Sequence, residues 1–136
     1  MTVPIWMVFF SLYGTGLSKD PNDPFYREHQ QNYLEAIKAP EAWDRIYDVP
    51  KANQTVIAVI GQGMMSDHED LRHNAIPGYN MIDKNTNTSD RDGTGTNVAG
   101  AAGAVTNNSI GIAGIAGTVK LMPIVYDATN DNTIAA

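Results

Sequence analysis

The chain has 136 residues, of which 43% are hydrophobic and 18% are charged, with a formal net charge of −6 and no cysteine. This length suits one domain at most, and the apolar content predicts a globular fold rather than a disordered chain. The acidic balance, without any basic cluster, disfavours nucleic-acid binding. No apolar stretch approaches the roughly 20 residues that span a bilayer, and the absence of cysteine excludes disulfides.

The first 24 residues are expected to form an extension, and residues 25–136 a domain. Residues 3–10 are apolar, but no positive charge precedes them and no clear Ala-x-Ala cleavage site follows. A strand, or a remnant of an upstream segment, is therefore favoured over a signal peptide. Proline, asparagine and aspartate in residues 20–24 predict the turn at which the domain begins.

The first half of the domain predicts helical segments and then one buried strand. Residues 25–37 read as irregular to helical, and a short helix is expected over residues 40–47, with its proline at the first position. Residues 56–60 form an apolar, β-branched run of the length of a buried strand. Ser66 and Glu69 have capping-box spacing, which predicts a short helix or helical turn.

The second half predicts a loop, a helix and another strand. Residues 83–92 are rich in Asn, Asp, Ser and Thr and indicate a surface loop. A helix is expected from residue 96 to about residue 105, with its glycines explained by close packing, and residues 120–125 read as the next core strand. Strand, helix and strand with continuous apolar strands predict an α/β fold with a parallel sheet. Ligand sites in such sheets lie beyond the carboxyl ends of the strands, which is where Gly61 falls.

Residues 92–100, Asp-Gly-Thr-Gly-Thr-Asn-Val-Ala-Gly, resemble the Asp-Gly-His-Gly-Thr-His-Val-Ala-Gly block of subtilisin-like serine proteases (peptidase S8, the subtilases). Four further blocks resemble the same family in the same order: residues 37–44, 56–71, 107–116 and 119–124. The resemblance extends over about residues 24–129. It implies the N-terminal part of a doubly wound, mainly parallel-sheet subtilisin-like domain, truncated relative to the family.

The resemblance places two of the three catalytic positions in this chain, and both are changed. Thr94 stands where the family has the histidine that acts as general base, and Gly61 stands where it has the catalytic aspartate. Threonine has no group that ionises near neutral pH, so it cannot accept the proton of a serine hydroxyl. The family's serine block matches nothing up to Ala136. The chain as it stands is therefore expected to be no enzyme.

The other histidines are not expected to replace the lost base. His68 corresponds to a family histidine that is not catalytic, and His29 and His73 match no catalytic position. Asn97 replaces the second histidine of the block, a packing residue in the family. An asparagine can still form hydrogen bonds there, so only a local effect is expected.

The resemblance also implies a structural calcium site. Asp70 stands at the spacing of the family's calcium-ligating aspartate, and residues 106–112 match its calcium loop. Carried over, the ligands are the side chains of Asp70 and Asn108 and the main-chain carbonyls of Thr106, Ile110 and Ile112. Calcium takes six to eight oxygen ligands in flexible geometry. The family's N-terminal glutamine ligand has no certain counterpart, and Glu28 or Gln31 is a candidate.

Three interpretations of function stay open. The chain is a pseudo-peptidase that binds peptides or a partner on the subtilase scaffold, or it is a fragment of a longer gene whose remaining half completes the domain. The third interpretation, an active peptidase by an unrecognised arrangement, is the least favoured because the catalytic groups are missing. The family implies secretion or the lumen of the secretory pathway. Strands 56–60 and 120–125 are expected to have uncovered apolar faces, because the family's core needs elements that follow them.

A dinucleotide-binding domain is a weak alternative. Gly61 and Gly63 follow a strand, and Asp83 lies about 20 residues further on, as in the dinucleotide fingerprint. Ser66 stands in place of the third glycine, however, and residues 67–70 put acidic charge where a pyrophosphate would bind.

Three triplets fit the acceptor pattern for N-linked glycosylation, beginning at Asn53, Asn87 and Asn107. Such short matches in an Asn-rich chain are weak signals, and Asn107 would be a poor acceptor in a formed calcium loop.

Overall fold

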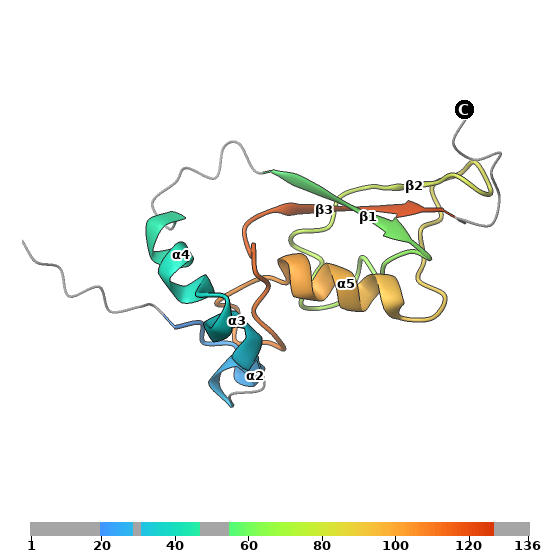
Figure 1. Ribbon diagram of the computed structural model, residues 1–136. Helices are drawn as coiled ribbons and strands as arrows, with labels where there is room; N and C mark the ends of the chain where they lie inside the picture. Colours follow the sequence, from blue (N-terminus) through green and yellow to red (C-terminus); the bar gives the residue numbers. More distant parts are fainter. Residues whose placement is uncertain (1–19, 29–30, 47–54, 127–136) are drawn as a thin grey trace, which may run out of the picture.

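The structure is a computed structural model, and it describes residues 20–28, 31–46 and 55–126. Three parallel strands form its sheet: β1 (Val56–Gly61), β2 (Tyr79–Asn80) and β3 (Lys120–Val125). The strands lie in the order β1-β3-β2, so β3 is central (Figure 1). The parallel sheet and the bounds of β3 agree with the sequence prediction, and β1 extends one residue further than expected.

Pro123 lies in the central strand although proline cannot donate to a strand ladder. The backbone N–H of Leu121 donates to the carbonyl of Asn74, on the β2 side of the strand. Residue 123, two positions on, faces the same side. The pairing with β2 begins only at Ile124, opposite Tyr79. The N–H that Pro123 lacks would therefore lie between the bridge from Leu121 to Ala75 and the pairing with β2, so no ladder hydrogen bond is lost there.

One face of the sheet packs on helix α5 (Thr94–Gly103), which lies along the sheet in Figure 1. The core between them contains Val59, Met64, Leu71, Ala99, Ala104, Val119 and Leu121. A Cβ atom at Gly103 would lie 2.8 Å from a methyl carbon of Val119 and 3.1 Å from a methyl carbon of Leu121 in β3. Glycine in this helix thus permits a close approach to β3, as the sequence predicted.

The other face of the sheet is open at β1. Val56 is 49% exposed and Ile60 is 65% exposed, whereas Val59, which points to α5, is 5% exposed. β1 is also an edge strand of the described sheet. The expected uncovered apolar face is present at these two residues of β1, whereas β3, for which it was also expected, has no exposed residue.

Three short helices form a second packing unit: α2 (Pro24–Arg27), α3 (Asn32–Ala36) and α4 (Ala39–Ile46). Their buried residues Tyr26, Leu34, Ala39 and Trp43 cluster with Ala113. The Trp43 indole N–H donates to the carbonyl of Ile115 at 2.8 Å. The α4 bounds agree to one residue with the helix predicted over residues 40–47.

The turn residues 20–24 belong to the packed fold. Pro21 and Asp23 are buried, and the Phe25 N–H donates to the carbonyl of Gly111. The expected boundary at residue 24 therefore crosses a packed segment, and the division into extension and domain stays a prediction. The apolar run at residues 3–10 lies outside the described residues.

Residues 66–75 form turns rather than a regular helix. Backbone hydrogen bonds from Leu71 and Arg72 to the carbonyl of His68 give helical turns. The predicted helical turn is therefore present, but the predicted short helix is not. No capping box forms, since the Ser66 hydroxyl donates to the carbonyl of Met64 instead. In the described part of the chain, no helix is both long enough and apolar enough to cross a membrane.

Candidate functional site

The first candidate position, Gly61, is the last residue of β1. It pairs with Val125, and its carbonyl accepts a hydrogen bond from the Tyr126 N–H at 2.9 Å. A Cβ atom built on Gly61 would meet no other atom within 4 Å. The position therefore has space for a side chain but supplies no functional group.

The second candidate position, Thr94, is the first residue of α5 and is exposed. Its N–H donates to the Asp92 carboxylate at 2.9 Å, and Gly93 before it is left-handed, with φ 83°. The helix therefore begins here by local capping, and the side chain at position 94 is a hydroxyl at the solvent surface.

Asp90 holds the start of α5 in place. Its carboxylate accepts hydrogen bonds from the N–H groups of Thr96 at 2.8 Å and Gly93 at 3.0 Å, and from the Thr96 hydroxyl. Partial burial opposes ionisation of this group, but the hydrogen bonds from Thr96, Gly93 and Asp92 outweigh it and lower the pKa of Asp90. The carboxylate thus stays ionised beside the positive end of the helix.

The loop after β1 touches the start of α5 directly. The Met65 N–H donates to the Thr96 hydroxyl oxygen at 2.9 Å. A Cβ atom at Gly95 would lie 1.7 Å from the carbonyl oxygen of Gly63, so only glycine permits this contact. The loop after β1 and the beginning of α5 are therefore held against each other, and the two elements next to this contact carry the Gly61 and Thr94 positions.

The described histidines lie elsewhere. His68 Nδ1 accepts a hydrogen bond from the Asp70 N–H at 3.1 Å, and His73 is an exposed residue whose carbonyl accepts from Lys120 Nζ. His29 lies outside the described residues. Asn97 is exposed, and its N–H makes a helical bond to the Gly93 carbonyl. None of these described side chains bonds to Gly61 or Thr94.

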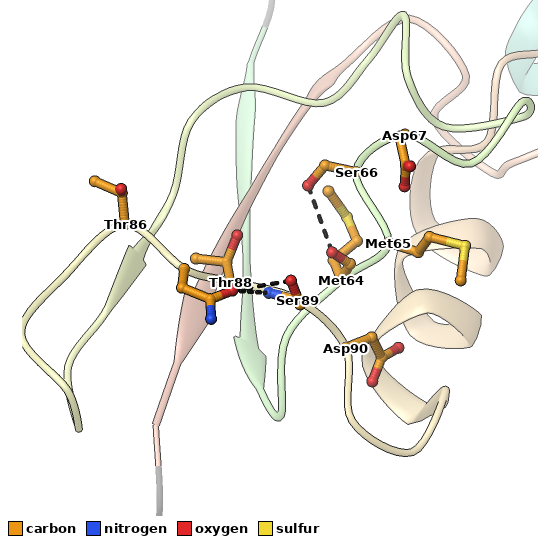
Figure 2. A pocket seen from close by; sticks show the side chains of 9 residues that line it. Met64, Met65, Ser66, Asp67, Thr86, Thr88, Ser89 and Asp90 are labelled. Atoms are coloured by element: carbon orange, nitrogen blue, oxygen red, sulfur yellow. Dashed lines mark hydrogen bonds between the residues drawn. The ribbon is translucent and has the colours of Figure 1, made fainter.

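A depression of about 470 Å³ lies beside the start of α5 (Figure 2). Residues 64–67 and 86–90 line it. Neither Gly61 nor Thr94 is among its lining residues. It is therefore separate from the two candidate positions.

Asp70, the expected calcium ligand, is buried in the structure, with 2% exposure. Its carboxylate accepts hydrogen bonds from Asn108 Nδ2 at 2.8 Å and from the Ile112 N–H at 2.9 Å. Asp70 therefore contacts the loop of residues 106–112 as predicted. The Asn108 Oδ1 atom accepts from the Ile110 N–H, so this amide presents nitrogen, not oxygen, to Asp70.

Asp23 is a further acidic residue at this loop, and sequence reasoning missed it. It is fully buried, and its Oδ2 accepts a hydrogen bond from the Asn107 N–H at 2.9 Å. Burial, and then the neighbouring charge of Asp70, raise the pKa of Asp23, although hydrogen bonds from Asn107 and Asn108 oppose them. The only signal for it in the sequence is the turn cluster at residues 20–24, whose composition indicates a boundary.

The Asp23 Oδ1 atom is buried and has no hydrogen-bond partner. An unpaired buried carboxylate oxygen is costly unless a cation or a donor meets it. In the described residues no three His, Cys, Asp or Glu side chains come together, so the charged part of this site is two aspartates. Two carboxylates, an amide and loop carbonyls are ligands of the kind that calcium prefers.

Of the two candidates for the N-terminal ligand, Gln31 is not at this site. Gln31 is buried, but its amide bonds to the main chain of Ala113, accepting from its N–H at 2.8 Å and donating to its carbonyl at 2.9 Å. Glu28 is exposed. Asp23, just before α2, contacts the loop instead, through the hydrogen bond from the Asn107 N–H.

The dinucleotide alternative is wrong. A pyrophosphate site needs a helix N-terminus directly after the glycine turn, and the residues after Gly63 form turns. A Cβ atom at Gly63 would meet the carbonyl oxygen of Ser89 at 2.4 Å, so this glycine packs against protein.

The fold and the site thus define an α/β protein with a parallel sheet, in which a strand end and a helix start meet. The sequence profile of the Subtilase family matches residues 52–135. The chain belongs to this family.

Thermitase of Thermoactinomyces vulgaris is 35% identical over 117 residues, which are 85% of this chain and 40% of that protein. The extracellular basic protease of Dichelobacter nodosus is 31% identical over 139 aligned positions, covering 76% of this chain and 22% of that protein. A solved protease of Pseudoalteromonas arctica PAMC 21717 is 29% identical with a TM-score of 0.61, covering 79% of this chain and 39% of that one. The chain therefore spans 40% or less of these relatives.

Proposed function

We propose that this chain is a subtilase-fold protein that lacks the catalytic base and is therefore catalytically degenerate. The observation that carries the proposal is Thr94, the first residue of α5, the helix whose first turn contacts the loop at the end of β1. Gly61, at that strand end, offers no carboxylate to orient a base. In the described residues, the imidazole of His68 bonds instead to the main chain of Asp70.

This proposal does not depend on where the nucleophile comes from. A serine supplied by a longer chain or by a partner would still need a base to take its proton. Loss of the base in a serine protease costs about 10⁶-fold in kcat, because the triad acts as a unit. The family activity, serine endopeptidase chemistry, is therefore expected to be absent.

The test is peptide hydrolysis together with labelling by a fluorophosphonate probe. We expect neither turnover nor labelling in the native chain, in Thr94→Ala or in a heat-denatured control. Labelling of the native chain that heat abolishes would overturn the proposal. Labelling that Thr94→Ala also abolishes would identify Thr94 as part of an unfamiliar arrangement.

We also propose that the loop site holds a structural calcium ion. The ligands of the ion would be the side chains of Asp23, Asp70 and Asn108. The main-chain carbonyls of Thr106, Ile110 and Ile112 would complete the set. The unpaired Oδ1 atom of Asp23 supports this, because a cation would offset its burial. The ion would supply no chemistry to catalysis. It would neutralise two aspartates and fix the loop against residues 20–25.

Peptide or partner binding is the second candidate, and the exposed residues of β1 favour it. Val56 and Ile60 leave apolar surface on an edge strand, which is typical of a surface that another segment covers. The occupant would be a peptide, another protein or the remaining half of a subtilase domain. A location outside the cell or in the secretory lumen is proposed by analogy with the extracellular relative.

A further inference from the structure

Asn87 is presented to solvent by a loop whose backbone is fixed. The side chain of Asn80 donates to the Asn87 carbonyl at 3.0 Å, and the Met64 N–H donates to the Thr88 carbonyl at 2.9 Å. Asn80 is itself buried, whereas Asn87 is exposed. The loop is thus held from its inner side, and the Asn87 side chain is on its outer side.

The Asn87 amide is paired with the hydroxyl two residues further on. Its Oδ1 accepts from the Ser89 hydroxyl at 2.9 Å and from the Ser89 N–H at 3.2 Å (Ser89 is labelled in Figure 2). Both donors bond to the oxygen, which leaves the amide nitrogen facing away from these contacts. Asn87, Thr88 and Ser89 therefore combine the acceptor pattern for N-linked glycosylation with the exposed loop position that this modification needs.

The Asn107 triplet has a different environment. The Asn107 Oδ1 atom accepts a hydrogen bond from the Asn22 N–H at 3.0 Å, and its own N–H donates to Asp23. The Ser109 N–H donates to the Asn22 side chain. A bulky substituent on Asn107 would therefore disturb the clamp between residues 20–25 and the loop. The third triplet begins at Asn53, outside the described residues.

We propose that Asn87 is a site of N-linked glycosylation in the folded chain. The donor is an oligosaccharide carried on a lipid pyrophosphate, and a transferase of the secretory pathway supplies the catalysis. The Asn87 Nδ2 atom forms a bond to C1 of the first sugar while the bond from C1 to the pyrophosphate oxygen breaks. The amide gives up one proton to a base of the transferase, and the lipid pyrophosphate leaves. The proposal rests on the secretory location proposed above and not on the loss of catalysis.

The test uses the full chain behind a cleavable secretory signal, produced in cultured animal cells and analysed by intact mass and peptide mapping. We expect a glycan on Asn87 that peptide N-glycosidase removes with conversion of the asparagine to aspartate. Asn87→Gln and Ser89→Ala should both lose it, whereas Ser89→Thr should keep it. Asn107→Gln is the matched control and should retain the Asn87 glycan.

Secreted wild-type chain with unmodified Asn87 would overturn the proposal, as would occupancy that Ser89→Ala leaves unchanged. Translation with microsomes gives the same readout as a gel shift when a variant fails to fold, because transfer there does not require secretion. Peptide hydrolysis measured on the same samples separates this result from the proposed loss of catalysis.

Discussion

Asn108 donates a hydrogen bond of 2.8 Å from Nδ2 to Oδ1 of Asp70, although 38 residues separate the two in the chain. The contact joins the turns after β1 to the loop after α5. It also puts an amide where a calcium ligand would need its oxygen. Whether Asn108 turns its amide nitrogen or its amide oxygen toward Asp70 therefore indicates whether the loop site binds an ion.

We expect calcium to raise the melting temperature, because a ligand that binds only the folded state stabilises it by mass action. At a free concentration of 100 times Kd the gain is about 2.7 kcal/mol. Asp70→Ala should abolish the calcium response, whereas Asp67→Ala, an exposed neighbour, should keep it. Calorimetry with added calcium and with chelator measures this. Equal melts in both conditions would mean that the loop is only a turn.

Asp23 should make the stability of the ion-free protein depend on pH. Burial raises its folded-state pKa above the ordinary value, so the folded state binds the proton more tightly than the unfolded state. The contribution of Asp23 to stability is then fully present below the unfolded pKa and is lost as pH rises through the folded pKa.

Asp23→Asn should remove this dependence and leave the ion-free protein at least as stable as wild type at pH 7. The same variant should gain nothing from calcium. Urea unfolding at several pH values, with metal-free protein, measures both effects. A variant that is less stable than wild type at neutral pH without calcium would show that the Asp23 carboxylate is stabilising by itself.

The scaffold should still place a restored aspartate beside a restored histidine. A neighbouring carboxylate within about 4–6 Å favours the charged imidazole and raises its pKa. We therefore expect the imidazole introduced by Thr94→His to titrate at higher pH in Gly61→Asp/Thr94→His than in Gly61→Asn/Thr94→His. NMR titration measures this difference. Equal pKa values in the two double variants would mean that the strand end and the helix start no longer face each other as in the family.

Two glycine-to-alanine variants should differ strongly in stability. A methyl group at Gly95 would overlap the Gly63 carbonyl oxygen, while one at Gly61 would meet open space. Overpacking typically costs about 1–3 kcal/mol and occasionally more, so Gly95→Ala should be destabilised by at least that amount. Gly61→Ala should stay within about 0.5 kcal/mol of wild type. Similar unfolding midpoints for both would rule out the close contact between Gly63 and Gly95.

The open face of β1 should make the chain self-associate or bind a hydrophobic dye. Replacing Val56 and Ile60 by threonine keeps β-branched residues in the strand and removes much of the exposed apolar surface. We expect less dye fluorescence and a smaller sedimentation coefficient for the double variant. A wild-type chain that is monomeric, melts cooperatively and binds little dye would mean that this face needs no partner.

The regular elements could be predicted from the sequence because their signals are local. The apolar run of residues 120–125 predicted β3, and the glycines of residues 96–105 predicted a closely packed helix. The start of that helix could not be placed from composition, because Thr94 begins it through contacts with Asp92 and Gly93. The resemblance to the subtilase blocks also places Gly61 and Thr94 at the family's catalytic positions, and this assignment stays a prediction.

Only the tertiary structure brought Asp23 to Asp70 and the loop of residues 106–112. The hydrogen bond between Asp23 and Asn107 joins residues 84 positions apart, and no periodic pattern in the sequence predicts such a contact. The sequence likewise made Gln31 a candidate calcium ligand, but in the fold its side-chain amide is hydrogen-bonded to the main chain of Ala113. Local propensity follows from the residues themselves, whereas burial of a charge and the identity of its partners depend on which distant segments pack together.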